Sequence, residues 1–391
     1  MERREVKLGD IITYNKGYAF KSNEYTNTGK MVVRVTDFTL DSISDNDSVY
    51  LKPNDKYKKF IINTNDILIQ TVGSWANNPN SIVGKVVRVP DKCDKAYLNQ
   101  NIVRIIPNKD FDNTYLYYAL KANQFSMYCV LRGQGAANQA SITLATIFKF
   151  KFRAHFFSEQ KRIADILSTY DTLIENNNKR IKLLEQMAEN LYKEWFVRFR
   201  FPGYEDVEFE DGIPKGWKIC RIDKLSKIKA GGDAPDVSTK EITDECSIPI
   251  YSNGIENEGL YGYTSKAKIN NPSITISARG TVGYTCLRRI PYTPIVRLIC
   301  IIPHEENLVN WLFYYFRRSI VIANGTSQQQ ITIPMISREK VLLPTNNLIQ
   351  KFYEYSTCYL DEIDSLKAQS SNLEKQRDLL LPRLMSGKLE V

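Results

Sequence analysis

The stretch from Ser158 to Val197, SEQKRIADILSTYDTLIENNNKRIKLLEQMAENLYKEWFV, decides the fold of this chain. Mostly apolar residues recur along it in alternating steps of four and three: Ile163, Leu167, Tyr170, Ile174, Asn177, Ile181, Leu184, Ala188, Leu191 and Trp195. This spacing predicts a long helix with a continuous apolar seam. Because a lone helix would leave that seam in water, the pattern also predicts a partner helix.

A second segment, 189 residues further along the chain, repeats the pattern. Its seam positions are Phe352, Ser356, Tyr359, Ile363, Leu366, Ser370, Leu373, Arg377, Leu380 and Leu384. Each segment is the nearest candidate partner of the other, and two helices that each follow their own globular part pair most simply in antiparallel fashion. The polar seam residues, which include Asn177 and Arg377, leave two alternatives open. Either they are buried and fix the register, or the seam is partly hydrated.

The globular sequence before each helical segment is also repeated. The matching pairs are Lys7–Gly17 with Arg221–Gly231, Asp66–Gly73 with Ser273–Gly280, Ile105–Pro107 with Ile301–Pro303, and Gln139–Thr143 with Gln328–Thr332. Their offset falls steadily from 214 through 207 and 196 to 189 residues, as expected if the second copy has shorter loops. The chain is therefore predicted to be a duplication of one unit, a globular domain followed by a long helix.

The predicted fold is α+β: two tandem domains of mixed α and β structure, each followed by a long helix, with the helices paired as an antiparallel coiled coil in pseudo-two-fold symmetry. The expected boundaries are a first domain at 1–153, a first helix at 154–200, a second domain at 201–343 and a second helix with a tail at 344–391. Residues 201–217, rich in Pro, Gly and acidic side chains, form the expected linker.

Within the domains, several segments are assigned from their apolar pattern. The runs Ile142–Phe152 and Ile331–Leu343 are expected to be strands, and Asn113–Val130 and Asn307–Ile322 are expected to be helices. Ser158 is the expected N-cap of the first long helix, and Thr345 or Asn347 that of the second.

Composition narrows the class of protein. The 391 residues are 43% hydrophobic and carry a net charge of +9, a mild basic excess that favours an anionic partner only weakly. Apolar runs are too short for a membrane span, and the charged start Met1–Glu5 does not look like a signal peptide, so we expect a cytoplasmic protein. Seven cysteines without a C-x-x-C pair favour neither a disulfide framework nor a zinc site, and no metal site is expected.

Catalytic motifs are missing from the sequence. It has no phosphate-binding Gly-rich loop ending in Gly-Lys-Ser/Thr, no Asn/Asp-Pro-Pro-aromatic motif for amino-methylation of a base, and no dinucleotide fingerprint. With only two histidines, the sequence is a poor candidate for a His-based catalytic triad or for a histidine-ligated metal site. We therefore expect no catalytic residues, and an enzyme acting alone is the weakest of the functional hypotheses.

Polar loops rich in Asn, Gln and Arg occur at equivalent places in both copies. Asn and Gln can contact adenine, Arg can contact guanine, and all three can contact phosphates, whereas the plainer interpretation is an ordinary polar turn. The recurrence in both copies makes a DNA-binding role worth proposing for these residues: Trp75, Asn77, Asn78, Arg132, Gln134, Asn138, Gln139, Asn253, Arg279, Arg288, Arg289, Gln328, Gln329 and Gln330.

The chain closely resembles the DNA-specificity subunit of type I restriction–modification systems. The resemblance rests on the helix opening Ser158–Ile163 (SEQKRI), the helix end Leu191–Phe196 (LYKEWF), the segment Ile213–Trp217 (IPKGW) and the tail Leu381–Leu389 (LPRLMSGKL). The second helix departs from the pattern, because Asn347–Gln350 replaces the Ser-Glu-Gln opening.

The resemblance implies a non-catalytic subunit that binds double-stranded DNA. Each domain, a target-recognition domain, would read one half of a bipartite asymmetric target, and the coiled coil would set the spacer. Two modification (methyltransferase) subunits and two ATP-dependent restriction subunits would assemble around the chain, with S-adenosylmethionine, ATP and Mg bound by those partners and no cofactor bound by this chain. An adaptor that binds only proteins is the alternative, but it leaves the doubled loops unexplained.

Overall fold

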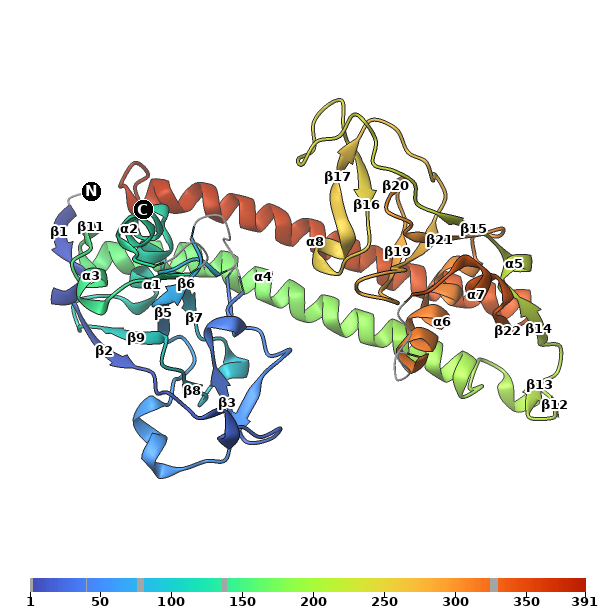
Figure 1. The fold of residues 1–391 in the computed structure, drawn as a ribbon, viewed down its shortest axis with the longest axis horizontal. Helices are drawn as coiled ribbons and strands as arrows, with labels where there is room; N and C mark the ends of the chain where they lie inside the picture. Colours follow the sequence, from blue (N-terminus) through green and yellow to red (C-terminus); the bar gives the residue numbers. More distant parts are fainter. Residues whose placement is uncertain (1–2, 40, 76–80, 136–138, 324–329) are drawn as a thin grey trace. The chain divides into compact units, whose positions relative to one another are not determined.

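The computed structural model describes residues 3–39, 41–75, 81–135, 139–323 and 330–391 (Figure 1). The chain forms two compact units, called here unit 1 (residues 1–176 and 369–391) and unit 2 (residues 177–368). Each unit therefore contains one globular part and a portion of each long helix. Among the described residues, no helix is long and apolar enough to cross a membrane.

Two small sheets form the globular part of unit 1. A four-stranded antiparallel sheet has the order β2 (Ile12–Lys16), β9 (Ile102–Pro107), β5 (Ile67–Gln70) and β7 (Val86–Arg88). A three-stranded sheet has the order β4 (Val49–Leu51), β3 (Lys30–Val33) and β8 (Tyr97–Leu98), with β3 and β8 parallel. The remaining strands form two pairs, β1 (Arg3–Lys7) with β11 (Lys151–His155) and β6 (Val72–Gly73) with β10 (Ala140–Ser141).

Unit 2 repeats the same two sheets. The four-stranded sheet has the order β15 (Ser226–Ala230), β21 (Ile299–Pro303), β18 (Ser273–Ile276) and β19 (Thr285–Arg288). The three-stranded sheet has the order β17 (Leu260–Thr264), β16 (Ile248–Tyr251) and β20 (Thr293–Pro294), again with the last pair parallel. The other pairs are β14 (Lys218–Arg221) with β22 (Lys340–Leu343), and the short linker hairpin of β12 (Phe209–Glu210) and β13 (Ile213–Pro214). Strand order and sense match unit 1, which confirms the predicted duplication.

Short helices complete both units, and two of them correct the sequence-based assignment. Unit 1 contains α1 (Asn113–Lys121), α2 (Asn123–Arg132) and α3 (Leu144–Ile147), and unit 2 contains α5 (Ile222–Leu225), α6 (Leu308–Ala323) and α7 (Ile333–Arg338). The runs Ile142–Phe152 and Ile331–Leu343, expected to be strands throughout, each hold a helix, α3 or α7, before the strand. The Thr143 hydroxyl accepts the N–H of Thr146 and caps α3, and Pro334 suits the first turn of α7.

The two long helices are α4 (Phe157–Tyr192), which ends in the π-helical turn Lys193–Val197, and α8 (Asn346–Met385). Ser158 was expected to be the N-cap of α4, but it lies inside the first turn, because the carbonyl of Phe156 already accepts the N–H groups of Glu159 and Gln160. Thr345 directly precedes α8, and its carbonyl accepts the N–H groups of Leu348 and Ile349. The second long helix therefore begins without the Ser-Glu-Gln opening.

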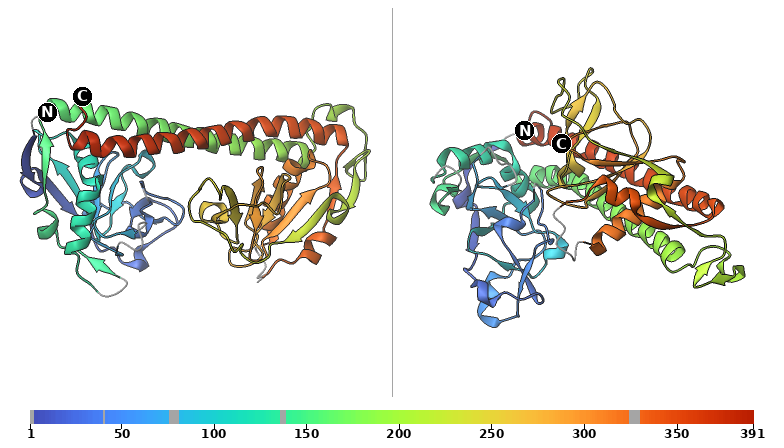
Figure 2. Two further views of the ribbon diagram at one scale, coloured as in Figure 1. Left: turned by 90° about the horizontal axis from the view of Figure 1, so that it is seen from above. Right: turned by 45° about the vertical axis from the view of Figure 1, so that its right-hand side comes forward.

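The predicted seam is confirmed in both helices, which lie side by side and run in opposite directions (Figure 2). All twenty seam positions are buried or half-buried. In unit 1, Ile163 and Leu167 share a core with Leu384. In unit 2, Phe352 packs against Tyr192, with ring centroids 6.1 Å apart.

The polar seam residues are buried rather than hydrated. Asn177, Ser356, Ser370 and Arg377 are each at most 7% exposed. The Ser356 hydroxyl donates to the Phe352 carbonyl and accepts from the Asn310 amide at 2.9 Å. Arg377 donates to Asp171 at 2.8 Å, so it joins α8 to α4 within unit 1. Of the two alternatives for the seam, burial is the one that the structure supports.

Candidate nucleic-acid interface

One edge of the four-stranded sheet carries the predicted loops in each unit. In unit 1, Gln70 at the end of β5 pairs with Ile102 at the start of β9. In unit 2, Ile276 at the end of β18 pairs with Ile299 at the start of β21. Since these strands are antiparallel, the segment after one and the segment before the other leave the sheet at the same edge.

A second loop is held at this edge by an equivalent hydrogen bond in both copies. The Ile142 N–H donates to the Thr71 carbonyl at 2.9 Å in unit 1, and the Ile331 N–H donates to the Ala278 carbonyl at 3.3 Å in unit 2. In unit 1 the short pair of β6 and β10 strengthens this link. The structure thus brings together, within each unit, the described ends of the two segments that the sequence singled out.

In unit 1, four predicted residues lie on these two loops. Trp75 is half-buried and packs against the core of the unit, close to Gly133, where an added Cβ would lie 3.4 Å from its ring. Arg132 is exposed, with its guanidinium 4.1 Å from the centroid of the Tyr128 ring. Gln134 and Gln139 are exposed, and the backbone of Gln134 exchanges hydrogen bonds of 2.8 and 2.7 Å with Ser141. The backbone is therefore fixed while polar side chains face solvent.

In unit 2, Arg279 and Gln330 flank the corresponding junction, and both are exposed. Arg279 follows Ala278, whose carbonyl accepts from Ile331, and Gln330 precedes Ile331. Five other predicted residues lie outside the residues that the structure describes: Asn77, Asn78, Asn138, Gln328 and Gln329.

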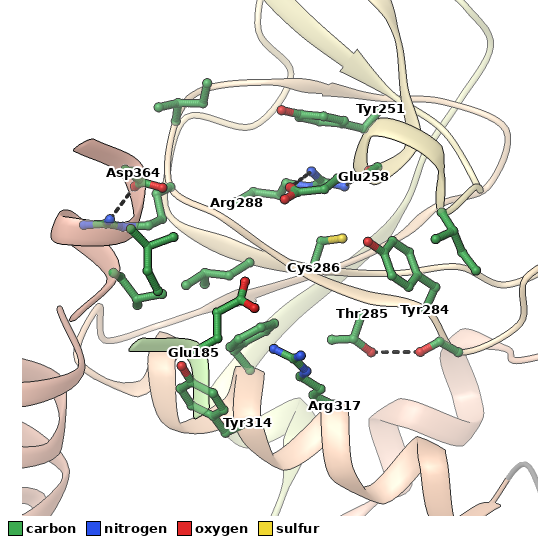
Figure 3. Close-up of a pocket in the computed structure, with 18 of the residues that line it drawn as sticks. Glu185, Tyr251, Glu258, Tyr284, Thr285, Cys286, Arg288, Tyr314, Arg317 and Asp364 are labelled. Carbon is green, nitrogen blue, oxygen red and sulfur yellow. Dashed lines mark hydrogen bonds and ion pairs between the residues drawn. The ribbon is translucent and has the colours of Figure 1, made fainter. Parts of the chain in front are cut away.

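Arg288 is part of the internal framework of unit 2, contrary to the role predicted for it. It is 4% exposed, and it donates to the Thr275 hydroxyl at 3.0 Å and to the Glu258 carbonyl at 2.5 Å. Its guanidinium lies 3.6 Å from the centroid of the Tyr251 ring. Figure 3 shows Arg288 between Glu258 and Tyr251 in the wall of a pocket of about 830 Å³. A guanidinium held in this way is not available to DNA.

Arg289 and Asn253 are also engaged inside unit 2. Arg289 forms ion pairs with Asp361 and Asp364 of α8. The Asn253 side chain donates to the Val296 carbonyl at 2.6 Å and accepts from the Ala278 N–H at 2.8 Å. Sequence spacing could not distinguish these internal contacts from DNA contacts, because the same side chains serve both. We therefore remove Arg288, Arg289 and Asn253 from the set of candidate DNA contacts.

A third segment reaches the same edge and was missed from the sequence. It is the turn before β9, at Gln100 and Asn101, and the turn before β21, at Val296 and Arg297. The signal that could have found it is the glycine shared by the two copies, Gly17 and Gly231, because an added Cβ at either would collide with this turn.

Burial changes the acid–base properties of several potentially reactive side chains in the described ranges. No group of three His, Cys, Asp or Glu side chains in the described ranges could hold a metal ion. His155 is buried against the Tyr115 hydroxyl, 2.9 Å from its Nδ1, and burial lowers the pKa of its imidazole. Burial likewise raises the pKa of the Cys300 thiol to about 11 and of the Cys129 thiol to about 12. Thiols that stay protonated in this way are poor nucleophiles.

Comparisons with known proteins agree with this picture. The profile of a family described as the type I restriction modification DNA specificity domain matches residues 2–186 and 214–374. This chain belongs to that family. The two matched regions correspond to the two copies of the repeat, and the family description favours a DNA-binding protein over an adaptor that binds only proteins.

Relatives along most of the chain carry the same description. The type I restriction enzyme MjaIX specificity subunit of Methanocaldococcus jannaschii is 29% identical over 319 residues, 75% of this chain and 73% of the relative. The HindI specificity subunit of Haemophilus influenzae is 22% identical, with 99% of both chains covered. The crystal structure of a type I S subunit from M. genitalium covers 98% of this chain and 96% of its own, with a TM-score of 0.63 and 17% identity, which supports the fold.

Proposed function

We propose that this chain is the DNA-specificity subunit of a type I restriction–modification complex, and that each unit reads one half of a bipartite, asymmetric DNA target. One observation carries the proposal. The described ends of the same two segments are joined at the same sheet edge in both units by equivalent hydrogen bonds, from Ile142 and from Ile331, and the exposed side chains beside these bonds differ between the units. A common framework with variable side chains suits two modules that read two different sequences.

Within this proposal, the target-recognition domains are residues 1–153 and 201–343, and the long helices lie within 154–200 and 344–391. The DNA contacts are the side chains of the joined loops that remain available, in particular Arg132, Gln134, Gln139, Arg279 and Gln330. The chain itself supplies no catalytic group. S-adenosylmethionine, ATP and Mg belong to two modification subunits and two restriction subunits that assemble around it in the cytoplasm.

The seam residues of α4 and α8 are used inside the chain, so partner subunits need other residues of the helices. Exposed apolar side chains outside the seam suit this role, because water-exposed Leu and Met on a polar helix favour a protein partner. Leu173, Leu183 and Met187 on α4 are 45–59% exposed. We assign the modification subunits to these outward surfaces of the helices.

The experiment that tests the proposal is DNA binding by the chain assembled with its modification subunits. Binding is measured by gel shift on a library of duplexes while the salt concentration is raised. We expect sequence-selective binding that weakens steeply with salt, because phosphate contacts release counterions. No DNA binding by the assembled complex would refute the proposal and favour the adaptor alternative.

The paired helices are proposed to set the spacing between the two half-targets. Seven residues, or two helical turns, are inserted into each long helix. In α4 the insertion lies between Asp171 and Arg180, and in α8 it lies between Glu362 and Arg377. Because both helices lengthen equally, the ion pairs Asp171–Arg377 and Arg180–Glu362 can still form. The insertion adds about 10 Å, or about three base pairs of B-DNA. A methylation map should show a spacer longer by that amount, and an unchanged spacer would contradict the role of the helices as a ruler.

A further inference from the structure

We propose that the turns before β9 and β21 form a third recognition loop in each unit, with Gln100 in unit 1 and Arg297 in unit 2 as side chains that determine specificity. This inference rests on the proposed function, because it adds contacts to the same DNA interface. The turns follow β8 and β20, and neither was among the predicted DNA-binding segments. In unit 2, β20 pairs with β16, and β21 lies between β15 and β18 (Figure 1).

In each unit, the backbone of a glycine lies in close contact with the turn and donates a hydrogen bond next to it. The Gly17 N–H donates to the Ile102 carbonyl at 3.1 Å, and the Gly231 N–H donates to the Leu298 carbonyl at 2.8 Å. An added Cβ at Gly17 would lie 1.8 Å from the Asn99 carbonyl oxygen, and at Gly231 it would lie 2.7 Å from the Ile295 backbone. Only glycine allows this close approach, so both copies keep the turn pressed against the end of β2 or β15.

Both turns are also tied to the first recognition loop. In unit 1, the N–H and the hydroxyl of Thr71 each donate to the Asn101 carbonyl at 2.9 Å. In unit 2, the Asn253 side chain makes the link, since it donates to the Val296 carbonyl and accepts from the Ala278 N–H. Because Thr71 and Ala278 also accept the bonds that hold the second loop, all three loops meet at one point in each unit.

The turn in unit 2 is held in a conformation that its residues disfavour. Val296 has φ 52° and Arg297 has φ 58°, in the left-handed region that suits glycine and is a genuine outlier for a β-branched residue. The N–H groups of Val296 and Arg297 donate to the Gly232 and Gly231 carbonyls at 2.8 and 3.0 Å, and these bonds keep the turn in place. Strained backbone of this kind persists where surrounding structure enforces it, commonly at functional sites.

The side chains presented by the turns are available to a ligand. Gln100 and Arg297 are exposed, and within the described part of the chain neither has a hydrogen-bond or ion-pair partner for its side chain. An amide suits adenine and a guanidinium suits guanine. The glycine contact that holds the turn is thus shared by the two units, whereas the backbone conformation of the turn and the side chains that it presents differ.

The test maps methylated adenines in a host genome after expression of the complete complex with wild-type chain, Arg297→Ala, Arg297→Lys or Gln100→Ala. We expect Arg297→Ala and Arg297→Lys each to relax one base-pair position in one half-target, by about ten- to a hundredfold in discrimination, because lysine cannot reproduce the bidentate contact. Gln100→Ala should relax one position in the other half. Arg338→Ala, which changes the exposed arginine at the end of α7, is the matched control and should leave the target unchanged.

Each alternative outcome has a distinct meaning. Unchanged targets for both turn variants would overturn the inference while leaving the proposed function intact. Weakening that is equal for all sequences, and that Arg297→Lys does not show, would assign Arg297 to phosphate and also overturn it. No sequence-specific methylation by the wild-type complex would instead refute the proposed function. Because the changed side chains are exposed, thermal unfolding should match the wild type, and an unfolded Arg297→Ala protein would contradict a purely recognition role.

Discussion

In unit 1 the globular part meets the long helices through buried charges, whereas in unit 2 it meets them mainly through aromatic rings. Arg377 of α8, 5% exposed, lies 2.8 Å from Asp171 of α4 and 3.4 Å from Asp41. The Tyr118 hydroxyl donates to Asp171 at 2.5 Å, and Lys121 forms an ion pair with Asp41 at 2.7 Å. Burial alone would raise the pKa of the Asp41 carboxyl, but Lys121 and Arg377 outweigh it and lower that pKa.

The aromatic cluster that joins the globular part of unit 2 to the helices is built around Phe352. Its ring lies 5.0 Å from that of Phe196 and about 6 Å from those of Trp195 and Tyr314, measured between centroids. By the offset of 189 residues, Arg377 corresponds to Ala188, and Asp171 corresponds to Leu360. Duplicated backbones have therefore kept their strand order while the chemistry that attaches them to the helices diverged.

The largest expected effect comes from breaking the charge network of unit 1. Arg377→Ala removes the nearer of the two guanidinium groups paired with the half-buried Asp171 and leaves Arg88 at 3.6 Å, so we expect a loss of about 3 kcal/mol in the free energy of unfolding. Arg289→Ala removes the ion pairs of unit 2 with the exposed Asp361 and Asp364, and should cost about 1 kcal/mol or less. Denaturant unfolding of both variants measures the difference. Equal losses would show that the two attachments are not chemically distinct.

A smaller effect separates equivalent apolar seam positions. Ile163 in unit 1 and Phe352 in unit 2 are both fully buried, and they occupy matching places in the repeat. Phe352→Ala should cost about 3–5 kcal/mol and Ile163→Ala about 2–5 kcal/mol. The aromatic variant should be the more damaging by about 1 kcal/mol, because its ring contacts are lost as well. If Ile163→Ala were clearly the worse of the two in denaturant unfolding, the aromatic cluster would not be the main attachment in unit 2.

A further effect concerns pH and Lys85, which is 6% exposed in unit 1. Burial lowers the pKa of its ammonium to about 8, with Asp41 opposing the shift and Lys121 adding to it. Between pH 8 and the ordinary pKa of 10.5, the unfolded chain binds more protons than the folded chain, so stability should rise with pH.

Lys85→Met removes this titration, so the stability of the wild type relative to the variant should increase between pH 8 and pH 10. Unfolding midpoints in denaturant at each pH measure that difference. A difference that stays constant across this range would show that the lysine is not held in a folded environment that disfavours its charge.

The sequence predicted the features that repeat with a fixed period or offset. The seam from Ile163 to Trp195 could be predicted because helix packing requires apolar residues at regular spacing. The matching glycines Gly17 and Gly231 could be seen in the repeat because both copies need a residue without a Cβ at that place. Side-chain partners were not predictable in this way. Arg288 looks like a DNA contact in a list of residues, but it is buried against Tyr251 because β19 turns it inward. Arg297 was overlooked, because its φ of 58° follows from neighbouring segments rather than from its own sequence.

The most direct test of the central claim, that two equivalent units read two different half-targets, is a methylation map made with a chimeric chain. Residues 273–336, from the start of β18 into α7, are replaced by the corresponding segment of a relative with a different target. The account predicts that one half of the methylated sequence changes, while the other half and the spacer stay the same. A change in both halves, or an unchanged target from a folded chimera, would contradict it.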